Sequence, residues 1–318
     1  MNNIVRNNTY NNSIIVIDGM WRCGKSLLTP LVGALENVDK VKFDYHSEWI
    51  AVLHHLKKID LETTSVLLKM YADLTTYNNF LGREINIRPN DDSGIFKNPK
   101  TIHYLQRIFK NDSDEVSSII EKDKPIQLIN THNVYQISRP FIKAFSERMV
   151  FLRCVRNPIS NIEDWADYFK KVGEDPREMN FYLGSGHVPW FVSSQNQEKY
   201  DSLERIEKAA LMYIELESLA QQIDEQQAFK NIKYLEIPFE NLTKNPDFFL
   251  SEISKMLGIK HHKSLIKYYK KLNLPRKSGD NKEYGNNKNS ILKKIKNKDI
   301  LDEFSKLVEE YESKYSEI

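Results

Sequence analysis

The chain has 318 residues, of which 40% are hydrophobic and 28% charged, a composition typical of a soluble globular protein that buries a sizeable core. Its formal net charge of +2 gives no overall field that would attract nucleic acid, so we expect no nucleic-acid partner. No apolar stretch approaches the roughly 18 residues of a membrane span, and the polar N-terminus lacks the apolar region of a signal peptide.

Cysteine and histidine usage narrows the class further. The chain contains only two cysteines, which argues against a disulfide framework. No set of Cys and His has the spacing of a zinc site, and His261 and His262 are expected to be a solvated pair. We therefore expect a cytoplasmic protein with no membrane span and no metal ligands.

The first part of the chain alternates short apolar runs with helical patterns. Residues 14–18 (IIVID) predict a buried strand, and residues 26–35 carry apolar positions at helical spacing. Residues 82–99 are rich in Asn, Asp, Gly and Pro and predict a surface loop. The other elements predicted in this part are a strand at 41–43 and helices near 47–58, 61–77, 100–110 and 114–122.

The second part of the chain continues this alternation. Ser138 is expected to cap a helix that has Pro140 near its start. Residues 275–290 are polar and are the best candidate for a mobile segment, and the basic stretch 260–298 is either a solvated surface or a flap that closes over an anion. The remaining predictions are strands at 126–129, 149–155 and 233–237, and helices near 202–224 and 246–257.

Strands that alternate with helices predict an α/β fold, here three α/β/α layers around a central, mainly parallel sheet of the P-loop type. We expect a single domain with its core at about 13–260, followed by a basic flap and helices at about 261–318. Ligands of such sheets collect beyond the carboxyl ends of the strands. The segments after Asp18, around His132 and around Arg156 should therefore lie close together.

Residues 19–26 (GMWRCGKS) satisfy the pattern G-x-x-x-x-G-K-[ST] between the first strand and the first helix. In such a loop, glycines let the backbone wrap an anion, consecutive N–H groups point inward, and the helix N-terminus adds a positive dipole end. Lys25 supplies a point charge, and Ser26 a hydroxyl for phosphate or metal. The alternative is an ordinary strand-to-helix turn, but the strand–loop–helix context favours phosphate binding.

The other strand ends bear on which phosphate chemistry follows. ATP-dependent kinases and hydrolases usually hold Mg²⁺ with an acidic residue at the end of a second apolar strand. Here one strand ends in Asn-Thr-His at 130–132 and the other in Arg-Asn-Pro at 156–158. Asp18 and Asp44 are possible metal or base residues, and each has an alternative role as a turn or cap residue.

Several motifs occur in an order that resembles the sulfotransferase family, which uses 3′-phosphoadenosine-5′-phosphosulfate (PAPS). The loop is similar to the family's first motif, with Trp21 in place of the usual Pro and Lys25 in place of the first Thr. The strand-end sequence VRNP resembles the second motif. The matching segments are 19–26, 155–158, 234–242 (YLEIPFENL) with Asn245-Pro246, 257–259 (LGI) and 276–280 (RKSGD).

The resemblance implies binding roles for these residues. Arg22 matches the basic residue that contacts the 5′-phosphosulfate, together with the backbone that follows it, and Arg156 matches the 3′-phosphate contact. Arg276 and Lys277 match the element that covers the cofactor. The full set of cofactor-binding residues implied is Gly19, Trp21, Arg22, Cys23, Gly24, Lys25, Ser26, Leu27, Arg156, Ser160, Arg276 and Lys277.

The resemblance also implies catalytic roles. His132 lies where the cytosolic branch of the family has its catalytic base, and a neutral imidazole there would take the proton of an acceptor hydroxyl. Lys25 or Arg22 would stabilise negative charge on the leaving phosphate. The alternative is that His132 is a structural histidine at the end of the strand. A carboxylate at Glu163 or Asp164 would then serve as the base.

Asp164 departs from the family pattern, which has a Ser eight residues after the arginine matched by Arg156. A carboxylate repels a 3′-phosphate unless it points away or pairs with a base such as Lys170, and Ser160 is one helical turn earlier. The sequence thus predicts a PAPS-dependent sulfotransferase that acts on a hydroxyl or amine of a small-molecule or carbohydrate acceptor and releases 3′-phosphoadenosine-5′-phosphate (PAP). A P-loop kinase or NTPase using Mg-ATP and a non-catalytic nucleotide-binding protein are the alternatives.

Overall fold

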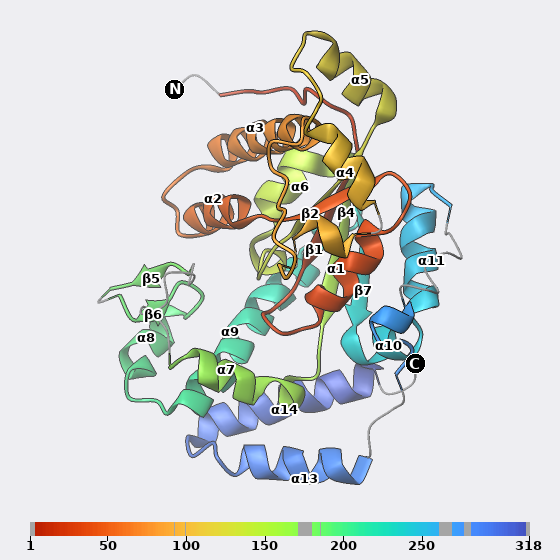
Figure 1. Cartoon of the computed structure of the whole chain (residues 1–318). Helices are drawn as coiled ribbons and strands as arrows, with labels where there is room; N and C mark the ends of the chain where they lie inside the picture. Colours follow the sequence, from red (N-terminus) through yellow and green to blue (C-terminus); the bar gives the residue numbers. More distant parts are fainter. Residues whose placement is uncertain are drawn as a thin grey trace.

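A five-stranded sheet lies at the centre of the chain in the computed structural model, which describes residues 4–91, 93–98, 100–170, 180–184, 186–260, 269–276 and 281–315 (Figure 1). All four pairings in this sheet are parallel. The spatial order is β2 (Val38–Phe43), β3 (Ile126–Asn130), β1 (Ile14–Asp18), β4 (Met149–Val155) and β7 (Lys233–Pro238). The predicted α/β class with a parallel sheet is confirmed.

One face of the sheet is covered by α1 (Lys25–Gly33) and α11 (Pro246–Leu257). Successive side chains of a strand point to opposite faces, so Ile15 and Ile17 of β1 pack on this side. The opposite face receives Ile14 and Val16 of the same strand. Every residue of β1 is buried, as its uninterrupted apolar run predicts for a strand covered on both sides.

Helices α9 (Arg205–Glu225), α6 (Arg139–Phe145), α3 (Leu61–Phe80), α2 (Tyr45–His55) and α14 (Lys298–Tyr315) form the larger core on this opposite side. Figure 1 shows α14 and α13 (Asn281–Leu292) side by side below the end of the sheet. The other elements are η1 (Ile95–Lys97), α4 (Thr101–Arg107), α5 (Glu115–Asp123), η2 (Tyr135–Ile137), η3 (Ser146–Arg148), η4 (Pro158–Ser160), α7 (Ile162–Tyr168), the hairpin of β5 (Tyr182–Leu183) and β6 (Val188–Pro189), α8 (Ser194–Tyr200) and α10 (Phe239–Lys244).

The predicted helix cap at Ser138 is wrong. Ser138 precedes α6, but its backbone is helical and its hydroxyl makes no cap bond among the described residues, because η2 runs directly into the helix. Of the polar segment 275–290, for which mobility is predicted, residues 281–290 are helical as part of α13, and residues 277–280 lie outside the described residues. Tyr284 holds this helix in place, since its hydroxyl donates to Glu312 at 2.6 Å and accepts from Asn157 at 2.7 Å.

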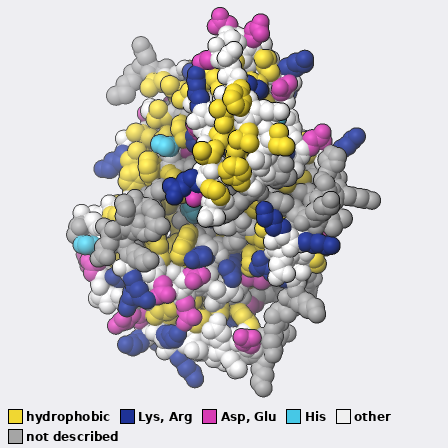
Figure 2. Space-filling view, in the orientation of Figure 1, with side chains coloured by type: hydrophobic (Ala, Val, Ile, Leu, Met, Phe, Trp, Pro, Cys, Tyr) yellow, Lys and Arg dark blue, Asp and Glu magenta, His cyan; other side chains and the backbone are white. Residues whose placement is uncertain are grey.

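The surface reflects the near-neutral composition. On the face drawn in Figure 2, Lys and Arg side chains are interspersed with Asp and Glu over the lower half, and hydrophobic side chains gather over the upper half. The exposed hydrophobic residues of α3 include Met70 and Leu74. None of the helices that the structure describes has both the length and the apolar character to cross a membrane.

Candidate functional site

The loop between β1 and α1 has a shape that requires both of its glycines. Gly19 has a φ of +149°, and a Cβ atom there would lie 2.3 Å from the carbonyl oxygen of Cys154. Gly24 has a φ of +104°, and its Cβ would lie 2.3 Å from Cδ2 of Phe239. Both positions thus combine a left-handed backbone with no room for a side chain.

The N-terminus of α1 is open to a ligand. Gly24 is its N-cap, and no described side chain caps the helix, so the first N–H groups are available to an anion. Ser26 is exposed in the first turn. The N–H of Leu27 donates to the Gly24 carbonyl at 2.9 Å and its side chain is buried in the core, so Leu27 supports the helix rather than facing a ligand.

Lys25 is folded back beneath the loop. Its Nζ donates to the carbonyl oxygens of Gly19 at 2.6 Å and Met20 at 2.8 Å, and only 5% of the residue is exposed. The ammonium therefore holds the loop's curvature and places a positive charge directly under the anion-binding backbone.

Arg22 points outward from the loop and is held weakly. Its guanidinium carbon lies 4.8 Å from the centre of the Trp21 ring, and its Nε lies 3.8 Å from Oδ2 of Asp164. The two side chains of this ion pair are 55% and 50% exposed, so the pair contributes little and Arg22 is free to turn to an anion. The sequence left open a pairing of Asp164 with a base such as Lys170, but Lys170 bonds to Asp167 instead, one turn further along the chain.

Two of the predicted arginines, Arg156 and Arg276, come together beside the loop that carries Arg22. Nη1 of Arg156 donates to the carbonyl of Arg22 at 3.0 Å, and its guanidinium lies 4.5 Å from the centre of the Phe239 ring. The Arg276 guanidinium lies 5.8 Å from the same ring, and its backbone N–H donates to Thr243 at 2.8 Å. Two guanidinium groups thus flank one aromatic ring next to the anion-binding backbone.

The surroundings of Arg156 contain unused hydrogen-bond donors. Its Nε and the Nδ2 of buried Asn161 have no partner among the described residues, and both side chains line one cavity. Ser160 is exposed at the end of η4, whereas Lys277 lies outside the described residues. Asn161 was missed by the sequence analysis, since nothing in the letters separates it from its neighbour Ser160.

Asp18 is a structural anchor. Its carboxylate is fully buried and accepts hydrogen bonds from Thr131 Oγ1 at 2.8 Å, Val134 N at 3.0 Å and Tyr135 N at 2.8 Å. These bonds tie the end of β1 to the loop that follows β3. Because that loop contains His132, Asp18 fixes the position of the histidine relative to the phosphate loop.

Asp44 has the capping role that the sequence analysis gave as an alternative. Its Oδ1 accepts from the N–H of Ser47 at 3.1 Å and so caps α2. Among the described residues, no three His, Cys, Asp or Glu side chains form a group that could hold a metal ion.

His132 is oriented by a carboxylate from α2. Oε1 of Glu48 lies 2.8 Å from the His132 backbone nitrogen and 3.1 Å from Nδ1 of the ring, and the ring lies parallel to that of Tyr45. We assign the proton to Nδ1, since this tautomer donates to Glu48 and leaves Nε2 as an acceptor.

The electrostatics favour a neutral imidazole. Burial, and next the charge of Lys25, lower the pKa of His132 to about 3. Burial, followed by the charge of Asp18, raises the pKa of Glu48 well above its usual range. Lys25 acts on both groups, so the histidine and the carboxyl lie within electrostatic reach of the phosphate loop.

Glu48 is the principal residue that the sequence analysis missed. A signal for it exists: it lies in the first turn of α2, directly after β2, and β2 pairs with β3. Side chains just beyond neighbouring parallel strands meet at one edge of the sheet. Because β2 was predicted only at 41–43 and its neighbour was unknown, this signal could not be used.

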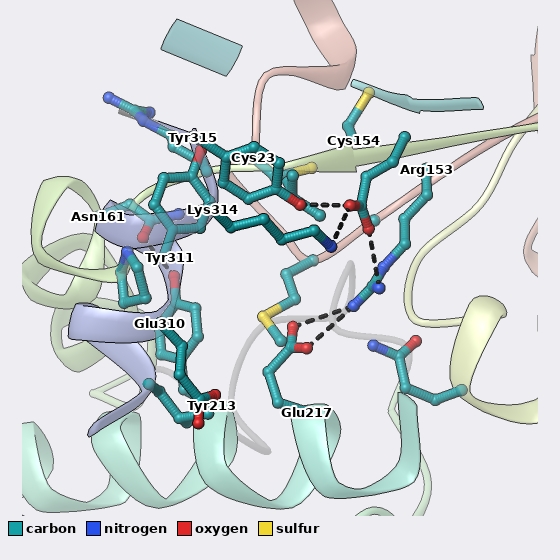
Figure 3. A pocket seen from close by; sticks show the side chains of 18 of the residues that line it. Cys23, Arg153, Cys154, Asn161, Tyr213, Glu217, Glu310, Tyr311, Lys314 and Tyr315 are labelled. Carbon is teal, nitrogen blue, oxygen red and sulfur yellow. Dashed lines mark hydrogen bonds and ion pairs between the residues drawn. The ribbon is translucent and has the colours of Figure 1, made fainter. Parts of the chain in front are cut away.

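A cavity of about 200 Å³ lies behind the loop, between the ends of β4 and β7 and helices α9 and α14 (Figure 3). Arg153 is buried in its wall and pairs with Glu217 at 3.0 Å and Glu236 at 3.1 Å. Figure 3 shows Arg153 and Glu217 pointing toward each other, and Lys314 of α14 reaching the same network. This network joins four elements around the back of the site.

Neither the family models nor the curated proteins compared with this sequence give a match. Sulfotransferases are among the solved structures similar to the chain. The sulfotransferase domain from the curacin biosynthetic pathway is 15% identical, with 85% of this chain and 79% of that one covered and a TM-score of 0.44. The sulfotransferase domain of a Synechococcus olefin synthase is 12% identical, with 85% of this chain and 79% of that one covered and a TM-score of 0.40. A sulfotransferase from Mycobacterium tuberculosis is 10% identical, with 86% of this chain and 73% of that one covered and a TM-score of 0.40.

Proposed function

We propose that this chain is a sulfotransferase that moves the sulfuryl group of PAPS to a hydroxyl or amine of a small-molecule or carbohydrate acceptor and releases PAP. The observation that carries the proposal is the neutral, Glu48-oriented imidazole of His132 within electrostatic reach of Lys25 in an anion-binding loop. PAPS supplies a sulfuryl group already activated by a phosphate leaving group. The chain needs only to hold anions and accept a proton.

The residues beside the loop suit a ligand with two phosphate groups. The open N-terminus of α1 and the charge of Lys25 fit the 5′ end, where Arg22 is free to turn. The unpartnered donors Arg156 Nε and Asn161 Nδ2 fit the 3′-phosphate, since buried donors without partners are costly. Arg276 adds charge on the same side.

His132 is proposed to accept the proton of the acceptor at Nε2, while Glu48 keeps the proton of Nδ1 in place. The free imidazole is a weak base because of burial and Lys25. An anion bound on the loop offsets the charge of Lys25 and raises the pKa of His132 towards the range where a general base works. His132 is therefore a stronger base when an anion is bound on the phosphate loop.

The rival function is a kinase or NTPase that uses Mg-ATP, which the sequence Gly24-Lys25-Ser26 favours. The strand ends next to β1 support the sulfotransferase instead. They present Asn130 and Arg156 rather than a carboxylate. Both carboxylate oxygens of Asp18 already accept hydrogen bonds from the loop after β3.

Thermal-shift titration with PAP, and with ATP in the presence and absence of Mg²⁺, tests the choice. We expect PAP to stabilise the fold most, by about 2.7 kcal/mol at a concentration 100 times its Kd. Tighter binding of Mg-ATP than of PAP rejects the sulfotransferase proposal. Labelled PAPS with a panel of hydroxyl and amine acceptors then identifies the acceptor.

Two substitutions separate binding from chemistry. Arg156→Ala should weaken PAP binding by about 1.5–3 kcal/mol, as for a lost charged hydrogen-bond partner. Arg83→Ala is the matched control, because Arg83 is exposed and pairs with Asp112 after α3. His132→Asn should leave PAP affinity unchanged and abolish turnover. Normal turnover in His132→Asn rejects the assignment of the base.

The proposal includes a cytoplasmic location. Both cysteines, Cys23 and Cys154, are free thiols, and free thiols persist in a reducing compartment.

A further inference from the structure

The only two cysteines of the chain meet at the phosphate loop. Cys23 belongs to the loop and Cys154 to β4, and both are buried free thiols. Asp18 pairs in register with Arg153, so the residues that follow, Gly19 and Cys154, lie side by side. A Cβ atom on Gly19 would lie 2.7 Å from the Cys23 sulfur and 2.3 Å from the Cys154 carbonyl oxygen, so both cysteines crowd one point of the backbone.

The two thiols have different environments. Nζ of Lys25 lies 3.8 Å from the Cys23 sulfur. Burial by itself raises the pKa of Cys23, but the Cys154 thiol and the Lys25 charge outweigh it and lower the pKa to about 7. The neighbouring Cys23 and burial raise the pKa of Cys154 well above its usual range. Cys23 is therefore the nucleophile of the pair, and Cys154 keeps its proton.

A cavity at the carboxyl end of β4 brings a small oxidant up to the two cysteines, whose side chains pack on the α1 side of the sheet. Cys23 and Cys154 line the cavity of about 200 Å³ behind the loop, and Figure 3 shows them at the same end of it. A water molecule takes about 30 Å³ of liquid volume, so the cavity has room for hydrogen peroxide.

We propose that Cys23 and Cys154 are an oxidation site, at which a hydroperoxide converts the two thiols into a disulfide that disables the phosphate loop. The Cys23 thiolate attacks one peroxide oxygen, the O–O bond breaks, and hydroxide leaves to take up a proton as water. The Cys154 sulfur then attacks the sulfenic sulfur of Cys23, the S–O bond breaks, and the Cys154 proton leaves with the oxygen as a second water. Two thiols and one peroxide thus give one disulfide and two waters.

The disulfide acts on the loop through its geometry. Bond formation draws the Cys23 sulfur towards β4, beside the backbone of Gly19, where even a Cβ atom would lie too close to both cysteines. The N–H groups that follow Cys23 at the start of α1 move with it, and Lys25 loses its thiolate neighbour. The inference goes beyond the proposed function, since it concerns the loop whichever nucleotide the loop binds.

Mass spectrometry of the intact protein after treatment with hydrogen peroxide gives the covalent test. We expect the wild type to lose two hydrogen atoms and both titratable thiols, and to regain them with dithiothreitol. Cys23→Ser and Cys154→Ser should form no internal disulfide. Separate oxygen additions to the two sulfurs, without loss of the two hydrogens, overturn the proposal.

Titration with PAP and with Mg-ATP gives the functional test. For the nucleotide that the reduced protein binds, oxidation should weaken affinity at least about tenfold, or 1.4 kcal/mol. Cys154→Ser should bind that nucleotide as the reduced wild type does, both before and after treatment with peroxide. Unchanged affinity in the disulfide form, or no binding of either nucleotide by the reduced protein, overturns the effect on the loop. Binding of Mg-ATP alone rejects the sulfotransferase and leaves the oxidation site standing.

Discussion

Asp18→Asn tests how the phosphate loop and the histidine are held together. The carboxylate of Asp18 accepts three hydrogen bonds, two at Oδ1 and one at Oδ2, all from the loop after β3. Asparagine has nearly the same shape but only one accepting oxygen. In either orientation of the asparagine side chain, its NH₂ group takes the place of an accepting oxygen and faces an N–H or O–H donor with which it cannot bond.

The magnitude follows from these bonds. One charge-assisted hydrogen bond is lost, which costs about 2 kcal/mol, and the other two become neutral, which costs about 1 kcal/mol each. We therefore expect Asp18→Asn to lower the free energy of unfolding by about 4 kcal/mol, measured from the urea midpoint at unchanged m-value. Because the loop carries His132, turnover should fall even below the temperature at which the variant unfolds.

Asp44→Asn is the matched control. Asp44 is also a buried carboxylate at a strand end, but it caps a helix, and asparagine caps about as well. Its substitution should cost less than about 1 kcal/mol. If Asp18→Asn unfolds at the same urea concentration as Asp44→Asn, the three bonds do not hold the loop and the reasoning is refuted.

Three further predictions concern the buried groups of the site. Arg153→Ala leaves the partly buried Glu217 without its cation and Glu236 with Lys314 alone, and should lower the free energy of unfolding by about 1–3 kcal/mol in urea; a loss below about 0.5 kcal/mol would contradict it. Because burial lowers the pKa of His132 to about 3, its ring should stay neutral, with the proton on Nδ1, down to about pH 5 in ¹⁵N NMR, where an ordinary histidine is charged. Titration near about pH 6.5 would contradict this. Gly24→Ala should abolish nucleotide binding in a thermal-shift assay, because its Cβ meets the Phe239 ring at 2.3 Å.

The sequence predicts a helix or strand correctly where the residues of that element carry a clear apolar pattern of their own. The predicted strand 149–155 and helix 246–257 coincide with β4 and α11, because each has an apolar pattern bounded by polar residues. β2 starts at Val38 rather than at the predicted 41. Its buried Asp39 is held by Arg107 at 2.8 Å, a partner 68 residues away that no local pattern reveals.

The site was predictable to the extent that it depends on strand order. Parallel strands with loops at one edge bring the phosphate loop, His132 and Arg156 together, and β1 lies between β3 and β4 as this requires. Glu48 was not predictable in the same way, because its place depends on β2 lying next to β3. The tautomer of His132 cannot be assigned without that carboxylate, and its neutral state follows from burial and from the charge of Lys25.

Asp164 departs from the family motif, and its neighbours in the structure give this departure a different effect from the one expected from the sequence. In the resemblance to sulfotransferases it stands where the family motif has a Ser, and it is expected to repel a 3′-phosphate unless it points away or pairs with a base. In the structure it faces Arg22, across 3.8 Å and half exposed to solvent. An exposed pair of this kind is worth at most about 1 kcal/mol, whereas a phosphate oxygen bound by the same guanidinium gains a charge-assisted, bidentate contact. The carboxylate therefore competes only weakly for Arg22, and its charge is offset by the loop itself and not by Lys170.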